Sequence, residues 1–243
     1  PAGGTRRIAA VLARLGIRAS RSSVQRMLRR PRRHPAVRAL PRSARGPLVA
    51  RRPNHVWMID FTRLRGILRP VFVGAVLDAF SRKVLAIRVV LGTPTARFAA
   101  GLLREALAAY GSPTWLVSDK DRTLRSRLVN ALLRRRGIGR RYGAVGLKGS
   151  IALIERFWRS LKQEYANGIS LFRPLASIQR DLAAYASWYS SERPHQGLGG
   201  RTPDEVYFGT DTRATVVPLR AALVVEHLGG DARLPILRLR RAA

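Results

Sequence analysis

Three acidic residues lie in segments whose pattern predicts the strands and helices of a folded domain. Asp60 lies within the apolar, strand-like segment 57–62. Asp119 directly follows the apolar run 115–118, and Glu155 lies in a segment with helical spacing of apolar residues. A carboxylate inside an apolar strand is costly to bury unless it is paired or metal-bound. Oxygen ligands of this kind favour Mg²⁺ or Mn²⁺, so the three residues are candidate metal ligands and catalytic residues.

Two such ions, held about 4 Å apart, can catalyse phosphoryl transfer. One ion activates the attacking water or 3′-hydroxyl, and the other stabilises the leaving oxygen. Each acid also has a structural alternative. Asp60 would then be a strand-edge residue, Asp119 the cap of the following helix, and Glu155 the ion-pair partner of Arg159 one turn on. The set and its spacing favour the metal site.

Four sequence blocks accompany the acids. They read WMIDFT at 57–62, LDAFSR at 77–82, ERFWRSLKQE at 155–164, and RPHQGL at 193–198 followed by Thr202 and Pro203. Between Asp119 and Glu155 there are 35 residues (155 − 119 − 1). In this order and spacing, the segment from about 54 to 209 resembles the catalytic core of D,D-35-E insertion-sequence transposases, relatives of the retroviral integrases. The joint match is specific, although no single block would be.

The resemblance implies an RNase H-like fold with Asp60, Asp119 and Glu155 as the metal site. It implies a transposase, a polynucleotidyl transferase that cleaves mobile-element ends and transfers them to target DNA with two Mg²⁺ (or Mn²⁺) ions. The partner is double-stranded DNA, and we expect a homo-oligomer because paired element ends need paired subunits.

Two departures from the family pattern leave an alternative open. Asp121 stands where the family usually has Gly, and Ser150 and Ile151 stand where it often has Asp-Asn. Asp121 adds a carboxylate beside the site, or it is an acid at the N-terminus of the next helix, favoured by the helix dipole. The alternative is a catalytically decayed, transposase-derived protein that binds DNA without cutting it.

The charge of the chain favours a polyanionic partner. Lys and Arg number 46 against 14 Asp and Glu, giving a formal net charge of +32, and residues 1–52 hold fifteen Arg and no acid. The sequence has no cysteine, which excludes disulfides and thiolate zinc sites. No apolar run approaches the roughly 20 residues of a membrane span. We expect a cytoplasmic, nucleoid-associated bacterial protein without a membrane partner.

The pattern divides the chain into four parts. Residues 1–30 predict a helix-turn-helix, and 31–53 a basic, proline-rich linker. Residues 54–210 predict the catalytic core, and 211–243 a small β tail. The DNA-contacting residues of the second helix would be Arg21, Gln25, Arg26 and Arg29. An ordinary helical hairpin with a solvated basic face is the alternative.

Within the core, strands are expected at 55–62, 71–78, 83–90 and 114–118, with a further short strand, and helices at 95–110, 123–136, 151–165 and 175–189. This order predicts an α/β fold, a mixed sheet flanked by helices. Arg159 and Lys162 follow Glu155 on one helix face, so we predict that they bind DNA beside the cut site. The alternative for them is a solvated, salt-bridged stripe.

Overall fold

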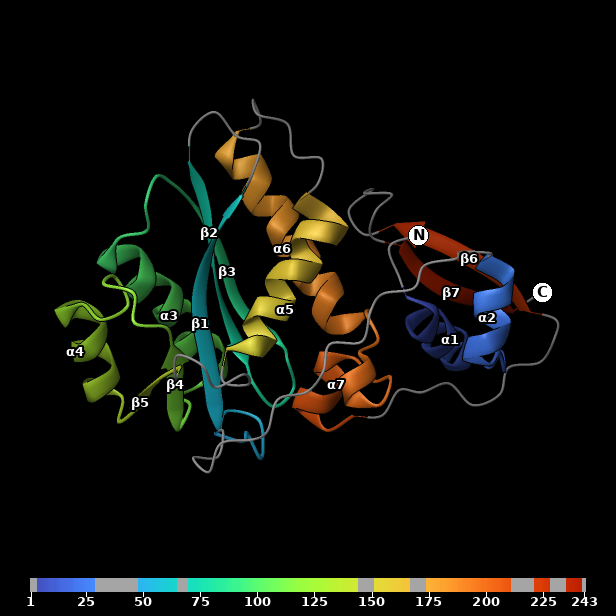
Figure 1. Ribbon diagram of the computed structural model, residues 1–243, viewed down its shortest axis with the longest axis horizontal. Coiled ribbons are helices and arrows are strands. Elements are labelled where there is room, and N and C mark those ends of the chain that lie inside the picture. Colours follow the sequence, from blue (N-terminus) through green and yellow to red (C-terminus); the bar gives the residue numbers. More distant parts are fainter. Residues whose placement is uncertain are drawn as a thin grey trace, which may run out of the picture.

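A computed structural model describes residues 4–28, 48–64, 70–143, 151–166, 174–210, 221–227 and 235–241. Its centre is a five-stranded sheet with helices on both faces (Figure 1). The expected α/β architecture is therefore confirmed, and the apolar strands lie between two layers of helices. None of the helices in the described ranges is both long and apolar enough to cross a bilayer.

The sheet combines an antiparallel half with a parallel half. β1 (Val56–Leu64) pairs antiparallel with β2 (Val71–Asp78), which pairs antiparallel with β3 (Val84–Leu91). β4 (Trp115–Ser118) and β5 (Gly139–Tyr142) add to the other side of β1 in parallel, giving the order β3-β2-β1-β4-β5. The central strand β1 is therefore hydrogen-bonded on both edges.

Helices cover both faces of this sheet. On one face lie α3 and α4, and on the other α5 and α6 (Figure 1). The helices of the core are α3 (Ala96–Tyr110), α4 (Arg127–Arg135), α5 (Ala152–Leu161), η1 (Lys162–Ala166), α6 (Leu175–Ser191), η2 (Gln196–Leu198) and α7 (Pro203–Phe208).

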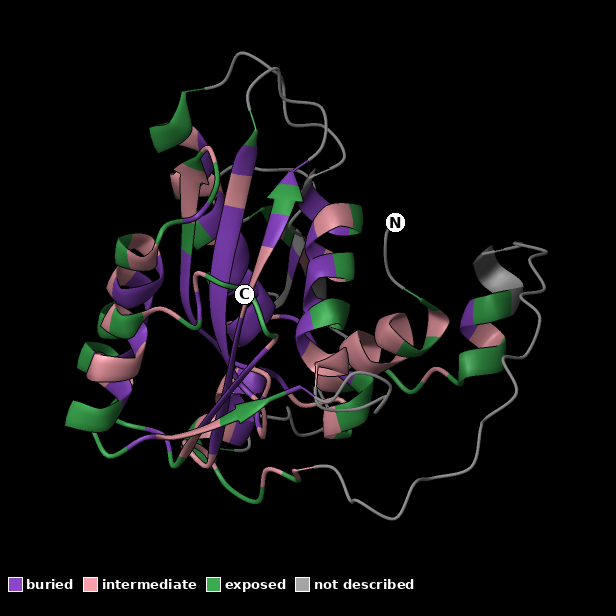
Figure 2. Cartoon of the chain, turned by 60° about the vertical axis from the view of Figure 1, so that its left-hand side comes forward, coloured by how far each residue is buried: buried purple, intermediate pink, exposed green. Residues whose placement is uncertain are grey.

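Alternation along β1 divides the apolar core into two clusters. Trp57 and Ile59 pack with α3 and α4, whereas Val56 and Met58 pack with α5 and α6. In Figure 2 the central strands are largely buried. Asp60 follows Met58 by two residues and so lies on the α5 face of the sheet. The strand period thus directs a carboxylate toward the helix that carries Glu155.

Three helical elements differ from the sequence expectation. α4 begins at Arg127 instead of residue 123, because residues 122–125 form a turn and the Ser126 hydroxyl accepts the Val129 N–H at 3.3 Å. The helix expected to reach residue 165 becomes a π-helix from Lys162. α7 was not predicted, although Thr202 and Glu205 form a capping box at its start.

Helices and strands also lie at both ends of the chain. α1 (Thr5–Arg14) and α2 (Arg21–Leu28) lie within the segment expected for the helix-turn-helix, and Ser20 caps α2 by accepting the Ser23 N–H at 3.1 Å. β6 (Ala221–His227) and β7 (Pro235–Arg241) form an antiparallel hairpin. Arg29 and most of the expected linker lie outside the described residues.

Candidate active site

Asp60 lies in the middle of β1 and is held by two N–H donors. The indole Nε1 of Trp158, on α5, donates to Asp60 Oδ2 at 2.8 Å, and the backbone N–H of Phe61 is the second donor. Burial raises the pKa of Asp60 to about 6, while the two donors act in the opposite direction. The charges of Asp119 and Glu155 raise the pKa of Asp60 further, which places both carboxylates within electrostatic reach of it.

Asp119 comes next to Asp60 through the parallel pairing of β1 with β4. Met58 is opposite Val117 in the register, and each acid follows its strand partner by two residues. The Asp119 carboxylate accepts the backbone N–H of Asp121 at 3.0 Å, which fixes it at the start of the turn after β4. Parallel pairing of neighbouring strands therefore brings two acids together that are 59 residues apart in the sequence (119 − 60).

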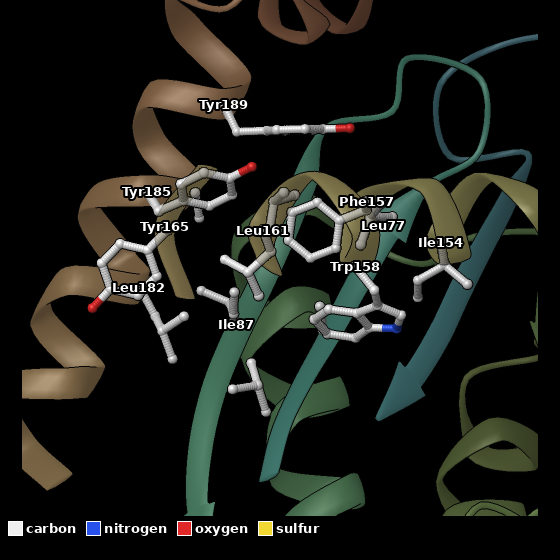
Figure 3. Close-up of a cluster of buried hydrophobic side chains, with 14 of the residues drawn as sticks. Leu77, Ile87, Ile154, Phe157, Trp158, Leu161, Tyr165, Leu182, Tyr185 and Tyr189 are labelled. Atoms are coloured by element: carbon white, nitrogen blue, oxygen red, sulfur yellow. The ribbon is translucent and has the colours of Figure 1, made fainter. Parts of the chain in front are cut away.

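Glu155 lies in the first turn of α5 and is exposed. α5 packs against the sheet through Ile154, Phe157 and Trp158, which are buried in the cluster shown in Figure 3. Negative charge in the first turn of a helix is favoured by the helix dipole. The packing of α5 on β1 thus places Glu155 at the side of the sheet toward which Asp60 points.

The three acids provide an oxygen donor set without a competing cation. Within the described residues, neither Asp60, Asp119 nor Glu155 forms an ion pair. No group of three or more His, Cys, Asp or Glu side chains in those residues is drawn together closely enough to hold an ion by itself. Mg²⁺ commonly uses one or two carboxylates and completes its shell with water and substrate phosphate, so an open carboxylate set fits this ion.

The turn that follows Asp119 is tied to β5 and to itself. Arg140 Nη2 donates to the Leu124 carbonyl and to Ser118 Oγ, the latter at 3.4 Å. Asp121 Oδ1 accepts the N–H of Thr123 at 2.7 Å. The Asp121 side chain thus caps the turn that precedes α4, which explains its presence without a role as a metal ligand.

The predicted DNA-contacting residues lie in two places. Arg21 and Gln25 are exposed on α2, Arg26 lies in the same helix with a side chain outside the described set, and Arg29 lies outside the described residues. On α5 and η1, Arg159 is exposed and Lys162 is half-buried, beyond Glu155 along the helix. Of these residues, Arg159 shares α5 with Glu155, and Lys162 begins η1, which continues directly from α5.

Sequence reasoning missed a buried ionic network at the end of the same helix. Glu164 accepts from Arg193 Nη2 at 2.8 Å, from Arg7 Nη1 of α1 at 2.6 Å, and from the Tyr185 hydroxyl at 2.9 Å. Glu164 and Arg193 belong to two of the motif blocks, which was the only indication in the sequence. The network joins α1 to the core.

Two further side chains have hydrogen-bond partners that were not predicted. Trp158 lies on the buried face of α5, and its N–H donates to Asp60. A buried indole needs an acceptor, which was the indication in the sequence. Asp78 accepts from Ser81 and from the Asn54 backbone, while Arg82 donates to the Gly197 carbonyl.

Comparison with protein families identifies the same region of the chain. Two family models, both described as Integrase core domain, match residues 50–147 and residues 136–203. Together they run from residue 50 to residue 203, which is more than half of the 243 residues. All three candidate acids lie within the matched region.

Individual relatives come from bacterial insertion sequences. A Burkholderia multivorans protein, "Insertion element IS407 uncharacterized 31.7 kDa protein", is 28% identical over 220 residues, covering 87% of this chain and 77% of that protein. A Lactococcus lactis protein, "Transposase for insertion sequence element IS904", is 26% identical over 160 residues, covering 63% of this chain and 61% of that protein.

Among solved structures, a chain of the simian T-cell lymphotropic virus intasome in complex with the PP2A regulatory subunit B56 gamma superposes with a TM-score of 0.57. Its sequence identity is 16%, and the match covers 89% of this chain and 79% of that chain. At this identity the likeness concerns the fold, and it confirms the expected RNase H-like arrangement of the core.

Proposed function

Because this chain belongs to the integrase core domain family of transposases, we propose that Asp60, Asp119 and Glu155 hold the divalent metal with which it cleaves and joins DNA. The chain is a transposase of the polynucleotidyl transferase class. The observation that carries the assignment of the site is the Asp60 carboxylate, partly buried on β1 without an ion-pair partner in the described residues and electrostatically coupled to the other two acids.

The roles of the three acids follow from where they lie. Asp60 is fixed by the Trp158 and Phe61 N–H groups, and Asp119 by the N–H of Asp121, so both carboxylates keep their orientation. Glu155 is exposed on α5 and can approach a ligand from the helix side. Mg²⁺ or Mn²⁺, when bound as a pair of ions, supplies activation of the attacking hydroxyl and neutralisation of the scissile phosphate.

A strongly basic surface adjoins Asp119 and offers a path for DNA. Between residues 120 and 141, the described chain has nine basic residues and one acid, Asp121. Eight of the nine are exposed, and none is ion-paired to another described residue. They are Lys120, Arg122, Arg125, Arg127, Arg134, Arg135, Arg136 and Arg141. Unpaired cations of this density favour phosphodiester contacts that weaken steeply with salt.

The remaining assignments extend this proposal to the whole chain. Residues 1–30 would bind mobile-element ends through Arg21, Gln25, Arg26 and Arg29, the basic segment 31–53 would follow the duplex, and 54–210 would act on it. Arg159 and Lys162 would grip DNA beside the cut site. The protein would act as a homo-oligomer on the DNA of the bacterial nucleoid, in the cytoplasm.

The test is cleavage and strand transfer on labelled duplex DNA carrying the ends of the element, with Mg²⁺, Mn²⁺ or a chelator. Asp119→Asn should lower product formation by roughly a thousandfold or more, because several kcal/mol of metal stabilisation are lost. Glu105→Gln, which removes an exposed carboxylate paired with Arg88 on the α3 side, is the matched control and should retain activity. Salt-sensitive binding without metal-dependent products would support the decayed, DNA-binding alternative.

A further inference from the structure

Trp158 connects the two elements that carry Asp60 and Glu155. It lies three residues after Glu155 on α5, so the two side chains leave the helix about one turn apart. Its ring is 5% exposed and packs against Phe157, with ring centroids 5.0 Å apart. In Figure 3 the indole lies at the edge of the buried cluster, with its nitrogen turned outward from it. That nitrogen donates to Asp60 Oδ2 at 2.8 Å.

We propose that Trp158 is a positioning residue for the metal site, which sets the orientation of the Asp60 carboxylate for the divalent ion. This inference rests on the proposed function of Asp60. A carboxylate that is free to rotate about its last bond must lose that freedom when it binds an ion. The indole N–H fixes Oδ2 and, together with the Phe61 N–H, removes this freedom beforehand, while the remaining carboxylate lone pairs stay available as ligands.

Because Trp158 lies on the same helix as Glu155, its hydrogen bond to Asp60 affects the placement of both acids. α5 is held on the sheet by Ile154, Phe157 and Leu161, all of which are buried. The bond from Trp158 to Asp60 adds a directional constraint to this non-directional packing. The rotation of α5 about its axis, which decides where Glu155 points, is therefore tied to the orientation of Asp60.

Trp57 shows what a purely structural indole looks like in the same sheet. It lies three residues before Asp60 on β1, is 0% exposed, and packs on the opposite face with α3. Its Nε1 donates at 2.9 Å to Oδ1 of Asn54, a neutral amide. Trp57 and Trp158 thus each bury an indole ring and donate one hydrogen bond. They differ in the acceptor, which is a proposed metal ligand only for Trp158.

The test compares Trp158→Phe with Trp57→Phe in the full chain. Each variant keeps a large aromatic ring and loses one indole hydrogen bond, so both should lose similar thermal stability. Binding of Mn²⁺, measured by electron paramagnetic resonance of the free ion, should weaken roughly tenfold or more in Trp158→Phe, the range seen when partners of ligating groups are removed. Trp57→Phe should bind Mn²⁺ as the wild type does.

Two outcomes would overturn the inference and are distinguishable from each other. Equal Mn²⁺ affinity in Trp158→Phe and Trp57→Phe would show that Trp158 contributes packing alone. The variant Asp60→Asn is measured beside them. If it binds Mn²⁺ as tightly as the wild type, the metal site itself is wrongly assigned, and the role of Trp158 fails with it.

Discussion

Two acids, Asp60 and Glu164, lie along the helix formed by α5 and η1, and their surroundings differ. Midway along the helix, the partly buried Asp60 accepts the N–H groups of Trp158 and Phe61. At the end, Glu164 receives two arginines, Arg193 and Arg7. Burial acts to raise the pKa of both carboxyls. It prevails at Asp60, whereas the two arginines outweigh it and lower the pKa of Glu164.

This difference separates a structural acid from one that is proposed to bind metal. Taking a carboxylate out of water is costly unless a positive charge compensates for it. At Glu164 the chain supplies that charge itself, and the result is a closed network that also involves Tyr185. At Asp60 no described residue supplies one. In a protein of net charge +32, an acid without a basic partner among the described residues is the feature behind the proposed metal site.

Neutralising the two acids one at a time is expected to have opposite effects on the metal-free protein. Glu164→Gln should lower the free energy of unfolding by about 3–5 kcal/mol, because it leaves the buried Arg193 without its counter-charge. Asp60→Asn should cause no loss or a gain, since it removes an uncompensated charge and keeps an acceptor for Trp158. Urea unfolding in the presence of a chelator measures both. Equal losses in the two variants would remove the distinction between the acids.

The pH dependence of stability should separate the acids by its sign. The folded-state pKa of Asp60 is raised to about 6, so the folded state binds more protons than the unfolded chain between about pH 4 and pH 6. The stability contributed by Asp60 should therefore fall as pH rises through this window, by up to about 3 kcal/mol. The folded-state pKa of Glu164 is lowered, so its contribution is present above the ordinary glutamate value and is lost as pH falls through the lowered pKa.

The measurement is the difference in unfolding free energy between wild type and each variant, in metal-free buffer, from about pH 3 to pH 8. The Asp60→Asn variant should gain on the wild type as pH rises, and Glu164→Gln should fall further behind it. Slopes of the same sign for both variants would contradict the assignment of the two environments.

The smallest expected effect comes from the outer arginine of the network. Arg7→Ala should lower the free energy of unfolding by about 1 kcal/mol, because the Arg7 side chain is 24% exposed and Arg193 still compensates Glu164. The loss should decrease at high salt. A loss as large as that of Glu164→Gln would mean that α1 is part of the cooperative core instead of an element attached to its surface. Denaturant titrations at low and high salt distinguish the two.

Local pattern determined much of the fold before any tertiary contact was considered. β2 was expected at 71–78 and lies at Val71–Asp78, because apolar residues on both of its faces read as a buried strand. α3 was expected to begin at residue 95, and Thr95 is its N-cap. Short elements were harder to predict. β5 was expected without bounds, and α7 was missed, because a few residues carry too little periodicity to define an element.

Residue types, spacing and local periodicity were sufficient for the family resemblance, the three candidate acids and the elements that carry them. Which groups surround each acid depends on the tertiary packing. Trp158 is 98 residues from Asp60, and Arg7 is 157 residues from Glu164. Contacts over such separations depend on how β1, α1 and α5 pack, which no local pattern encodes. That packing leaves Asp60 without a basic partner among the described residues and gives Glu164 its two arginines.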